Sequence, residues 1–105
     1  MFRAGRYLYT VFMCHLAIEK ALKGLYVEIR GSAAPKTHNL ISLLNATAVI
    51  PPADMMRLIA RLNETSVTTR YPEKLRTLQR HFTVDIVRPI LAETRKTLAW
   101  IRSQP

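Results

Sequence analysis

The chain has 105 residues, the size of one small domain, and 16 basic against 7 acidic residues give it a formal net charge of +9. Hydrophobic residues make up 49% of it, which excludes a disordered chain. Cys14 is the single cysteine, so an internal disulfide is excluded and we expect a cytoplasmic protein, where thiols stay reduced. The longest apolar run, residues 7–18, is too short to cross a bilayer, and we expect neither a membrane span nor a signal peptide.

The first predicted helix covers residues 2–30. Its apolar positions recur at intervals of three and four, the period of an α-helix. They are Tyr7, Val11, Cys14, Ile18, Leu22, Leu25 and Ile29. Four more residues widen the apolar face, namely Leu8, Phe12, Leu16 and Tyr26. A helix with so broad an apolar face is expected to have neighbours on more than one side, and Gly31 is expected to end it in a left-handed conformation.

Two shorter helices are predicted over residues 38–48 and 52–65. Thr37 or Asn39 can cap the first helix. Its expected inward residues are Leu40, Leu43 and Leu44. Pro52 suits the first position of the second helix. The expected inward residues of that helix are Met55, Leu58, Ile59 and Leu62.

The last third is predicted to contain a loop over 66–73, a short helical stretch over 75–82 and a long helix over 84–102. If Asp85 caps the long helix, Pro89 falls in its first turn, where a missing N–H costs little; if the helix starts nearer Leu75, Pro89 should kink it. We expect a break near Thr83. Neither a strand pattern nor an internal repeat is visible. The expected fold is therefore all-α, a single up-and-down helical bundle of the four-helix type that fills residues 1–105.

Four short motifs suggest a family. The segment 14–25 (CHLAIEKALKGL) resembles the AxExALKxL helix of HEPN domains, and 35–40 (PKTHNL) resembles their PKTHDL turn. Residues 70–73 (RYPE) resemble the RYPD loop, and 98–102 (LAWIR) the closing LEWVR. The motifs occur in the family's order and cover most of the chain, so the sequence resembles a HEPN domain.

This resemblance implies a helical bundle that is usually a homodimer, binds nucleotides or RNA, and often occurs with a minimal nucleotidyltransferase. Family members normally carry another helix before the one predicted over 2–30. A truncated chain, a misassigned start and a partner covering that face all remain open as explanations. Some branches are metal-independent endoribonuclease toxins.

The nuclease branches use an Arg-x4–6-His motif near the last helix, and Arg76 with His81 is the match here. That spacing is expected about once by chance in a chain of this composition. His81 could take a proton from a ribose 2′-OH, and Arg76 could stabilise charge on the phosphate. On a regular helix, however, the two side chains lie about 140° apart. The alternative is an exposed helix without catalytic function.

The other candidate residues are nucleotide- or phosphate-binding. Lys36 and His38 precede a helix N-terminus, which could hold a phosphate, or Thr37 there is only a cap. Arg70 could face a cleft and Tyr71 could stack on a base. Alternatively Tyr71 fills one end of the bundle and Arg70 pairs with Glu19. The remaining candidates on the first helix are Glu19 and Lys23, which belong either to the same cleft or to a solvated face.

No metal site is expected, because Cys14 and His15 are adjacent on a helix and point about 100° apart. No cofactor is expected either. The sequence thus predicts a HEPN-like domain that interacts with a nucleotide or RNA. By the resemblance, we expect it to act beside a minimal nucleotidyltransferase in a toxin–antitoxin-like pair. One alternative is an endoribonuclease toxin that uses Arg76 and His81. A second is a non-enzymatic assembly module whose basic face binds an acidic protein.

Overall fold

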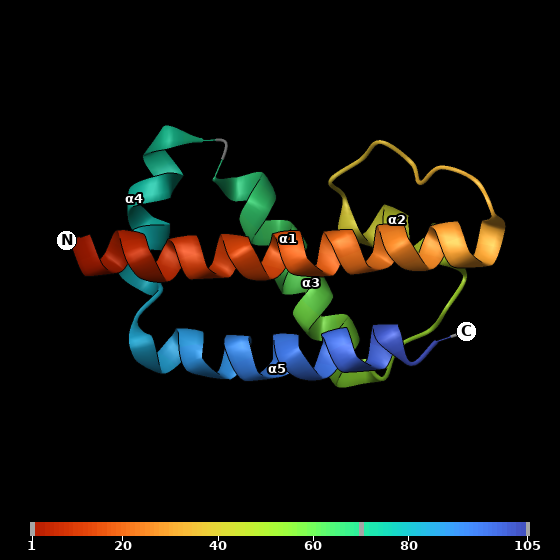
Figure 1. Ribbon diagram of the computed structural model, residues 1–105. Coiled ribbons are helices and arrows are strands. Elements are labelled where there is room, and N and C mark those ends of the chain that lie inside the picture. The colour runs from red at the N-terminus through yellow and green to blue at the C-terminus, as the bar shows by residue number, and fades with distance from the viewer. Residues whose placement is uncertain (1, 70, 105) are drawn as a thin grey trace.

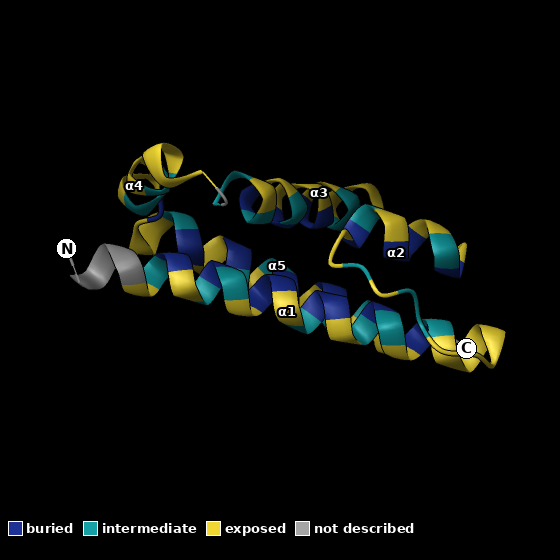
Figure 2. Cartoon of the chain, turned by 90° about the horizontal axis from the view of Figure 1, so that it is seen from above, coloured by how far each residue is buried: buried dark blue, intermediate teal, exposed yellow. Residues whose placement is uncertain are grey.

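The computed structural model describes residues 2–69 and 71–104, and within them the chain forms five helices and no strand. The helices are α1 (Phe2–Arg30), α2 (Leu40–Thr47), α3 (Ala53–Thr68), α4 (Pro72–His81) and α5 (Val84–Arg102). The all-α prediction is confirmed. Figure 1 shows α1 and α5 side by side and running the same way. The helix α3 returns in the opposite general direction across one face of this pair, in a second layer (Figure 2). The short helices α2 and α4 lie near opposite ends of α1 (Figure 1).

The inner face of α1 forms one wall of the core. Six of its apolar side chains are buried, namely Leu8, Val11, Cys14, Ile18, Leu22 and Leu25. The predicted stripe is thus largely confirmed, although Ile29 is 39% exposed near the helix end. Leu16 was expected to widen the covered face, but it is 41% exposed, because no other helix of the described chain covers that side of α1.

The helix α2 is shorter than the predicted 38–48 and is capped by Asn39, whose side chain accepts a hydrogen bond from the Ser42 N–H at 3.0 Å. Thr37 does not cap it; its hydroxyl accepts from the Asn39 N–H. The three leucines predicted to face inward, Leu40, Leu43 and Leu44, are all buried. Ala48 ends the helix in the left-handed region at φ 63°.

Between α3 and α4 the predicted loop over 66–73 is wrong in extent. The helix α3 continues to Thr68, and α4 already begins at Pro72. Tyr71 has the extended backbone that a following proline imposes, at φ −107° and ψ 110°. Proline is well tolerated at the first helical position, where its missing N–H has no intrahelical partner. Pro72 therefore starts a helix here instead of prolonging a loop.

The break near Thr83 is confirmed, but the expected capping of α5 is not. Thr83, not Asp85, occupies the N-cap position, and Pro89 lies inside the helix beyond its first turn. The Asp85 carbonyl thus loses the partner that an ordinary residue at 89 would provide. Because Pro89 is exposed, the ring causes no clash in the core. The core side of α5 carries Val87, Ile90, Thr94, Thr97 and Ile101.

Candidate functional site

A cleft lies between α1, the segment 31–39 and α3. It consists of two adjoining cavities of about 450 and 250 Å³ that share His38 and Ser66. The larger has an apolar wall from α1, made by Tyr9, Phe12, Met13 and Leu16. Its polar side is formed by His15, Glu19, His38 and Ser66. The smaller cavity adds Thr37, Asn39, Asn63 and Val67. We call this the α1–α3 cleft.

Glu19 is the centre of the polar side. Its carboxylate is almost wholly buried, yet it meets three basic side chains. Oε2 accepts from Lys23 Nζ at 3.1 Å and lies 2.9 Å from His38 Nδ1. Oε1 lies 3.8 Å from His15 Nδ1 and has no hydrogen-bond partner. The buried charge is thus compensated by Lys23 and His38, both of which reach solvent.

The pKa of Glu19 lies below its ordinary value of 4.5. Burial alone would raise this pKa, but the hydrogen bonds and positive charge of His38 and Lys23 outweigh burial. Glu19 is therefore ionised at neutral pH. Through its contact with His38, Glu19 holds the segment between α1 and α2 against the middle of α1.

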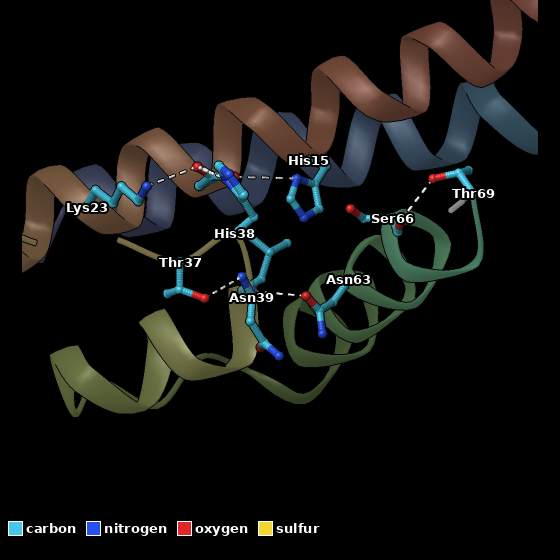
Figure 3. A network of polar contacts seen from close by, with 10 residues as sticks. His15, Lys23, Thr37, His38, Asn39, Asn63, Ser66 and Thr69 are labelled. Atoms are coloured by element: carbon cyan, nitrogen blue, oxygen red, sulfur yellow. Dashed lines mark hydrogen bonds and ion pairs between the residues drawn. The ribbon is translucent and has the colours of Figure 1, made fainter. Parts of the chain in front are cut away.

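His15 is the second buried polar group of the cleft. Burial lowers its pKa below 6.5, and the nearby Glu19 opposes this shift only in part. Its Nε2 atom is buried without a hydrogen-bond partner. Figure 3 shows the His15 ring projecting from α1 towards Ser66 on α3, and both residues line the larger cavity. A neutral imidazole in this position offers one unsatisfied ring nitrogen.

The N-terminus of α2 closes one end of the cleft, but its N–H groups are largely occupied. The Leu40 N–H donates to Oδ1 of Asn63, which lies beside Asn39 (Figure 3), at 2.9 Å. The Ser42 N–H donates to Asn39 Oδ1 at 3.0 Å. Lys36 is exposed on the segment before it and lines neither cavity. A phosphate at this N-terminus would have to compete with Asn63 and Asn39.

Three of the remaining predicted residues, Tyr71, Arg76 and His81, line neither cavity of the cleft. Tyr71 is 49% exposed with Lys74 Nζ 5.3 Å from its ring centre, so it does not fill the end of the bundle. Arg70 falls outside the described residues, and with it the predicted pair to Glu19. Arg76 and His81 are both exposed on α4. The side chain that approaches His81 Nε2 is Arg61, at 3.5 Å, not Arg76.

Comparison with known proteins decides the family. The HEPN domain model matches residues 1–104. The chain belongs to the HEPN domain family. No curated protein and no solved structure matched the chain significantly. The sequence resemblance is thereby confirmed, and the chain is a helical domain of a family associated with nucleotides and RNA.

Two of the HEPN motifs meet in the cleft. The helix motif contributes Glu19, which lines the larger cavity and is bonded to Lys23. The PKTH turn contributes His38, nineteen residues further along the chain than Glu19. The predicted catalytic pair, Arg76 and His81, lies on the regular helix α4, where the two side chains point about 140° apart. Within one protomer they do not form a joint site.

Most residues that line the cleft are absent from the sequence-based candidates, and among them are the polar residues His15, Asn63 and Ser66. For His15 a signal was present, because it stands four residues before Glu19 and so shares its helix face. For Asn63 and Ser66 the sequence offers no comparable signal. Among the described residues, no helix is long and apolar enough to span a bilayer, and no group of three or more potential ligands could hold a metal ion.

Proposed function

We propose that this HEPN domain binds a nucleotide or a short stretch of RNA in the α1–α3 cleft. The observation that carries the proposal is the meeting of Glu19 and His38, two predicted binding residues from separate motifs, at one cavity, with Lys23 bonded to the same Glu19 carboxylate. The cavity of about 450 Å³ has the size of a small-molecule site. It also has an aromatic and apolar wall beside a few polar groups, which is the composition such sites usually have.

The chemistry of the walls suits a nucleotide. Tyr9 and Phe12 provide apolar ring surface for a base. The free Glu19 Oε1 and His15 Nε2 are unsatisfied groups that hydrogen bonds from a base edge would pair. The phosphates would lie towards Lys23 and the exposed His38, and the net charge of +9 would attract them from a distance.

A titration with matched charge changes tests this proposal. The domain is titrated with ATP, with GTP and with a single-stranded RNA of about ten nucleotides. Binding is measured by calorimetry at two salt concentrations. Lys23→Ala and His38→Ala are expected to weaken binding about tenfold, which is what the loss of one charged hydrogen bond costs. Lys96→Ala on α5 removes the same charge as Lys23→Ala but leaves the cleft intact. Equal weakening by Lys23→Ala and Lys96→Ala would show that only the overall charge attracts the ligand.

We further propose that the domain is a homodimer in the cytoplasm and acts with a minimal nucleotidyltransferase in a toxin–antitoxin-like pair. The family membership supports this, since HEPN domains often dimerise. The first step is to look for a gene for a minimal nucleotidyltransferase beside this one. Co-expression of the two products is expected to give a complex that survives gel filtration. Expression of the HEPN domain alone is expected to arrest growth, and co-expression is expected to relieve the arrest. Unchanged growth in both cases would contradict the pairing.

A further inference from the structure

Three arginines form a straight exposed line on α5. Arg88, Arg95 and Arg102 follow one another at intervals of seven residues, which is close to two turns of helix. Their side chains therefore leave α5 within about 40° of one another. Ala92 and Ala99 stand between them, so that the five positions alternate in steps of four and three. All five residues are exposed, and we call them the α5 arginine line.

The α5 arginine line faces away from the rest of the protein. The buried residues of α5 lie on average about 140° around the helix from it. Figure 1 shows α5 along one edge of the molecule. No residue of the line contributes to either cavity of the α1–α3 cleft. The line is therefore a surface separate from the cleft, and a long ligand can reach it.

The three arginines have no partner in the part of the chain that the structure describes. Within residues 2–69 and 71–104, none of them makes an ion pair or a hydrogen bond. Arg30, by contrast, donates to the carbonyl of Ala46. The helix dipole favours a cation in the last turn and so accounts for Arg102, but not for Arg88 or Arg95.

Acidic residues lie at the two ends of the line and not along it. Asp85 precedes Arg88 by three residues and lies in the first turn of α5, where the positive end of the helix dipole favours it. At the other end, Arg102 shares a cavity of about 460 Å³ with Lys20 and Glu28 of α1. Between these ends the line presents cations and methyl groups only.

This arrangement fits an extended chain with regularly repeated negative charge. The arginines span about 21 Å, and each planar guanidinium can donate two parallel hydrogen bonds to one phosphate. Ala92 and Ala99 have small side chains, so a chain that lies along the helix meets no obstacle between the arginines. A single strand of nucleic acid can follow such a straight line, whereas each strand of a duplex turns away from it.

The energetics of ion pairing favour a nucleic acid over an acidic protein. Exposed pairs of arginine and carboxylate contribute little to binding, because both ions are well solvated. A nucleic acid carries condensed counterions, and each arginine that neutralises a phosphate releases some of them, which favours binding. The net charge of +9 adds a long-range attraction for any polyanion.

We propose that the α5 arginine line binds the phosphodiester backbone of single-stranded nucleic acid without regard to base sequence. The three guanidinium groups each neutralise one phosphate of the strand. This surface does not depend on ligand binding in the α1–α3 cleft. It gives the domain a second site, which holds the strand through its backbone.

The salt dependence of binding counts these phosphate contacts. The probe is a fluorescent 2′-O-methyl oligouridine of about 15 nucleotides, which cannot be cleaved through attack by a 2′-hydroxyl. Anisotropy gives its binding constant between about 50 and 200 mM salt. Arg88→Ala/Arg95→Ala/Arg102→Ala is expected to make the slope of log K against log salt shallower by about 2, since each contact on a single strand contributes about 0.7. Helical circular dichroism should be unchanged, because alanine favours helix.

A second triple variant controls for overall charge. Arg57→Ala/Arg80→Ala/Lys96→Ala removes three cations at exposed positions outside the line and is expected to change the slope much less. An equal change of slope in both triple variants would overturn the proposal. A DNA strand of the same length is expected to show the same difference between the two variants, because only the backbone is bound. Displacement of the oligonucleotide by an equal concentration of a peptide with glutamates seven residues apart would overturn the proposal in favour of an acidic protein.

The same comparison in a Lys23→Ala background separates this surface from the cleft. The difference in slope between the two triple variants is expected to persist there at about 2. Loss of the difference would overturn the α5 arginine line as a separate site. Failure of ATP and GTP to bind, with the difference preserved, would contradict the proposed function of the cleft and leave the α5 arginine line supported.

Discussion

His38 Nδ1 lies 2.9 Å from Glu19 Oε2, and this contact fastens the segment between α1 and α2 to the middle of α1. Glu19→Gln removes the negative charge with which both His38 and Lys23 interact. We expect it to lower the free energy of unfolding by about 1.5–3 kcal/mol, the range for hydrogen bonds to a charged group. Urea denaturation at pH 7 measures the change.

A double-mutant cycle separates the two partners. Because the His38 side chain is 71% exposed, its coupling to Glu19 is expected to be only about 0.5–1 kcal/mol. Glu28→Gln, an exposed carboxylate on the same helix, serves as control and should change stability by less than about 0.5 kcal/mol. A Glu19→Gln effect as small as that of the control would contradict a structural role for this carboxylate.

The stability of the domain is expected to fall as the solution becomes acidic. Burial lowers the pKa of His15 in the folded chain. As the pH falls below 6.5, His15 therefore becomes protonated in the unfolded chain before it does so in the folded chain. Stability is therefore lost as the pH falls from 6.5 through the lowered pKa. The lowered pKa of Glu19 acts in the same direction: its contribution is present above pH 4.5 and is lost as the pH falls through the folded value.

The variant His15→Gln isolates the histidine. Urea midpoints at pH 7.5, 6.5, 5.5 and 5.0 are expected to decline less steeply for His15→Gln than for the wild type. His81→Gln, at an exposed position on α4, is the matched control and should keep the wild-type slope. If His15→Gln and the wild type lose stability in parallel between pH 6.5 and 5.0, His15 is not the group responsible.

Two isoleucines of opposite burial provide a test of the core. Ile59 is fully buried on α3, whereas Ile50 is 87% exposed between α2 and α3. Ile59→Ala leaves a cavity among packed side chains and is expected to cost about 2–5 kcal/mol. Ile50→Ala should change stability by less than about 0.5 kcal/mol. Comparable shifts of the thermal midpoint in both variants would contradict the packing described for α3.

Ala48 offers a stabilising substitution. It ends α2 with φ 63°, a left-handed conformation that suits glycine better than alanine. Ala48→Gly is expected to stabilise the domain by about 0.5–1 kcal/mol. Ala46→Gly, two residues earlier within the helix, is expected to destabilise it by a similar amount. Chemical denaturation of the two variants should therefore give shifts of opposite sign.

Arg76 and His81 are expected to contribute nothing to RNA cleavage by a single protomer. Their side chains diverge on α4, and Arg61 is the residue that approaches the His81 ring. A fluorescent RNA incubated with chelator should be cut equally, or not at all, by the wild type and by Arg76→Ala/His81→Ala. Cleavage that disappears only in the double variant would revive the endoribonuclease alternative, with the two residues acting across protomers.

The sequence predicts the helices well, because the three-to-four spacing of apolar residues is a local property. It places Leu40, Leu43 and Leu44 inside, and their burial follows. The prediction is wrong at 66–73, because Pro72 can either end one element or begin the next. Leu75 and Leu78 of α4 pack against the core, and this packing favours a helix that begins at Pro72. Local spacing also predicts the first turn of α5 wrongly, since either Thr83 or Asp85 could cap it.

The cleft was only partly predictable. Glu19 and Lys23 share a helix face by their spacing, but the approach of His38 depends on how the segment 31–39 folds back. The contribution of Asn63, whose side chain accepts from the Leu40 N–H, requires knowledge of how α3 crosses α2. Periodicity identifies which residues share a face, not which faces meet.

The helix α4 contains no buried residue, and the buried side chain nearest to it is Phe82, just beyond its end. The free energy that holds this helix in place therefore comes from Phe82 and from the partly buried Leu75 and Leu78. Its amide protons are expected to exchange with deuterium through local opening, well before those of α1, α3 and α5, which open only when the whole domain unfolds. A molecule that binds against α4 would therefore slow the hydrogen exchange of its amides. The exchange rate of this peripheral helix would thus show whether such a molecule is bound.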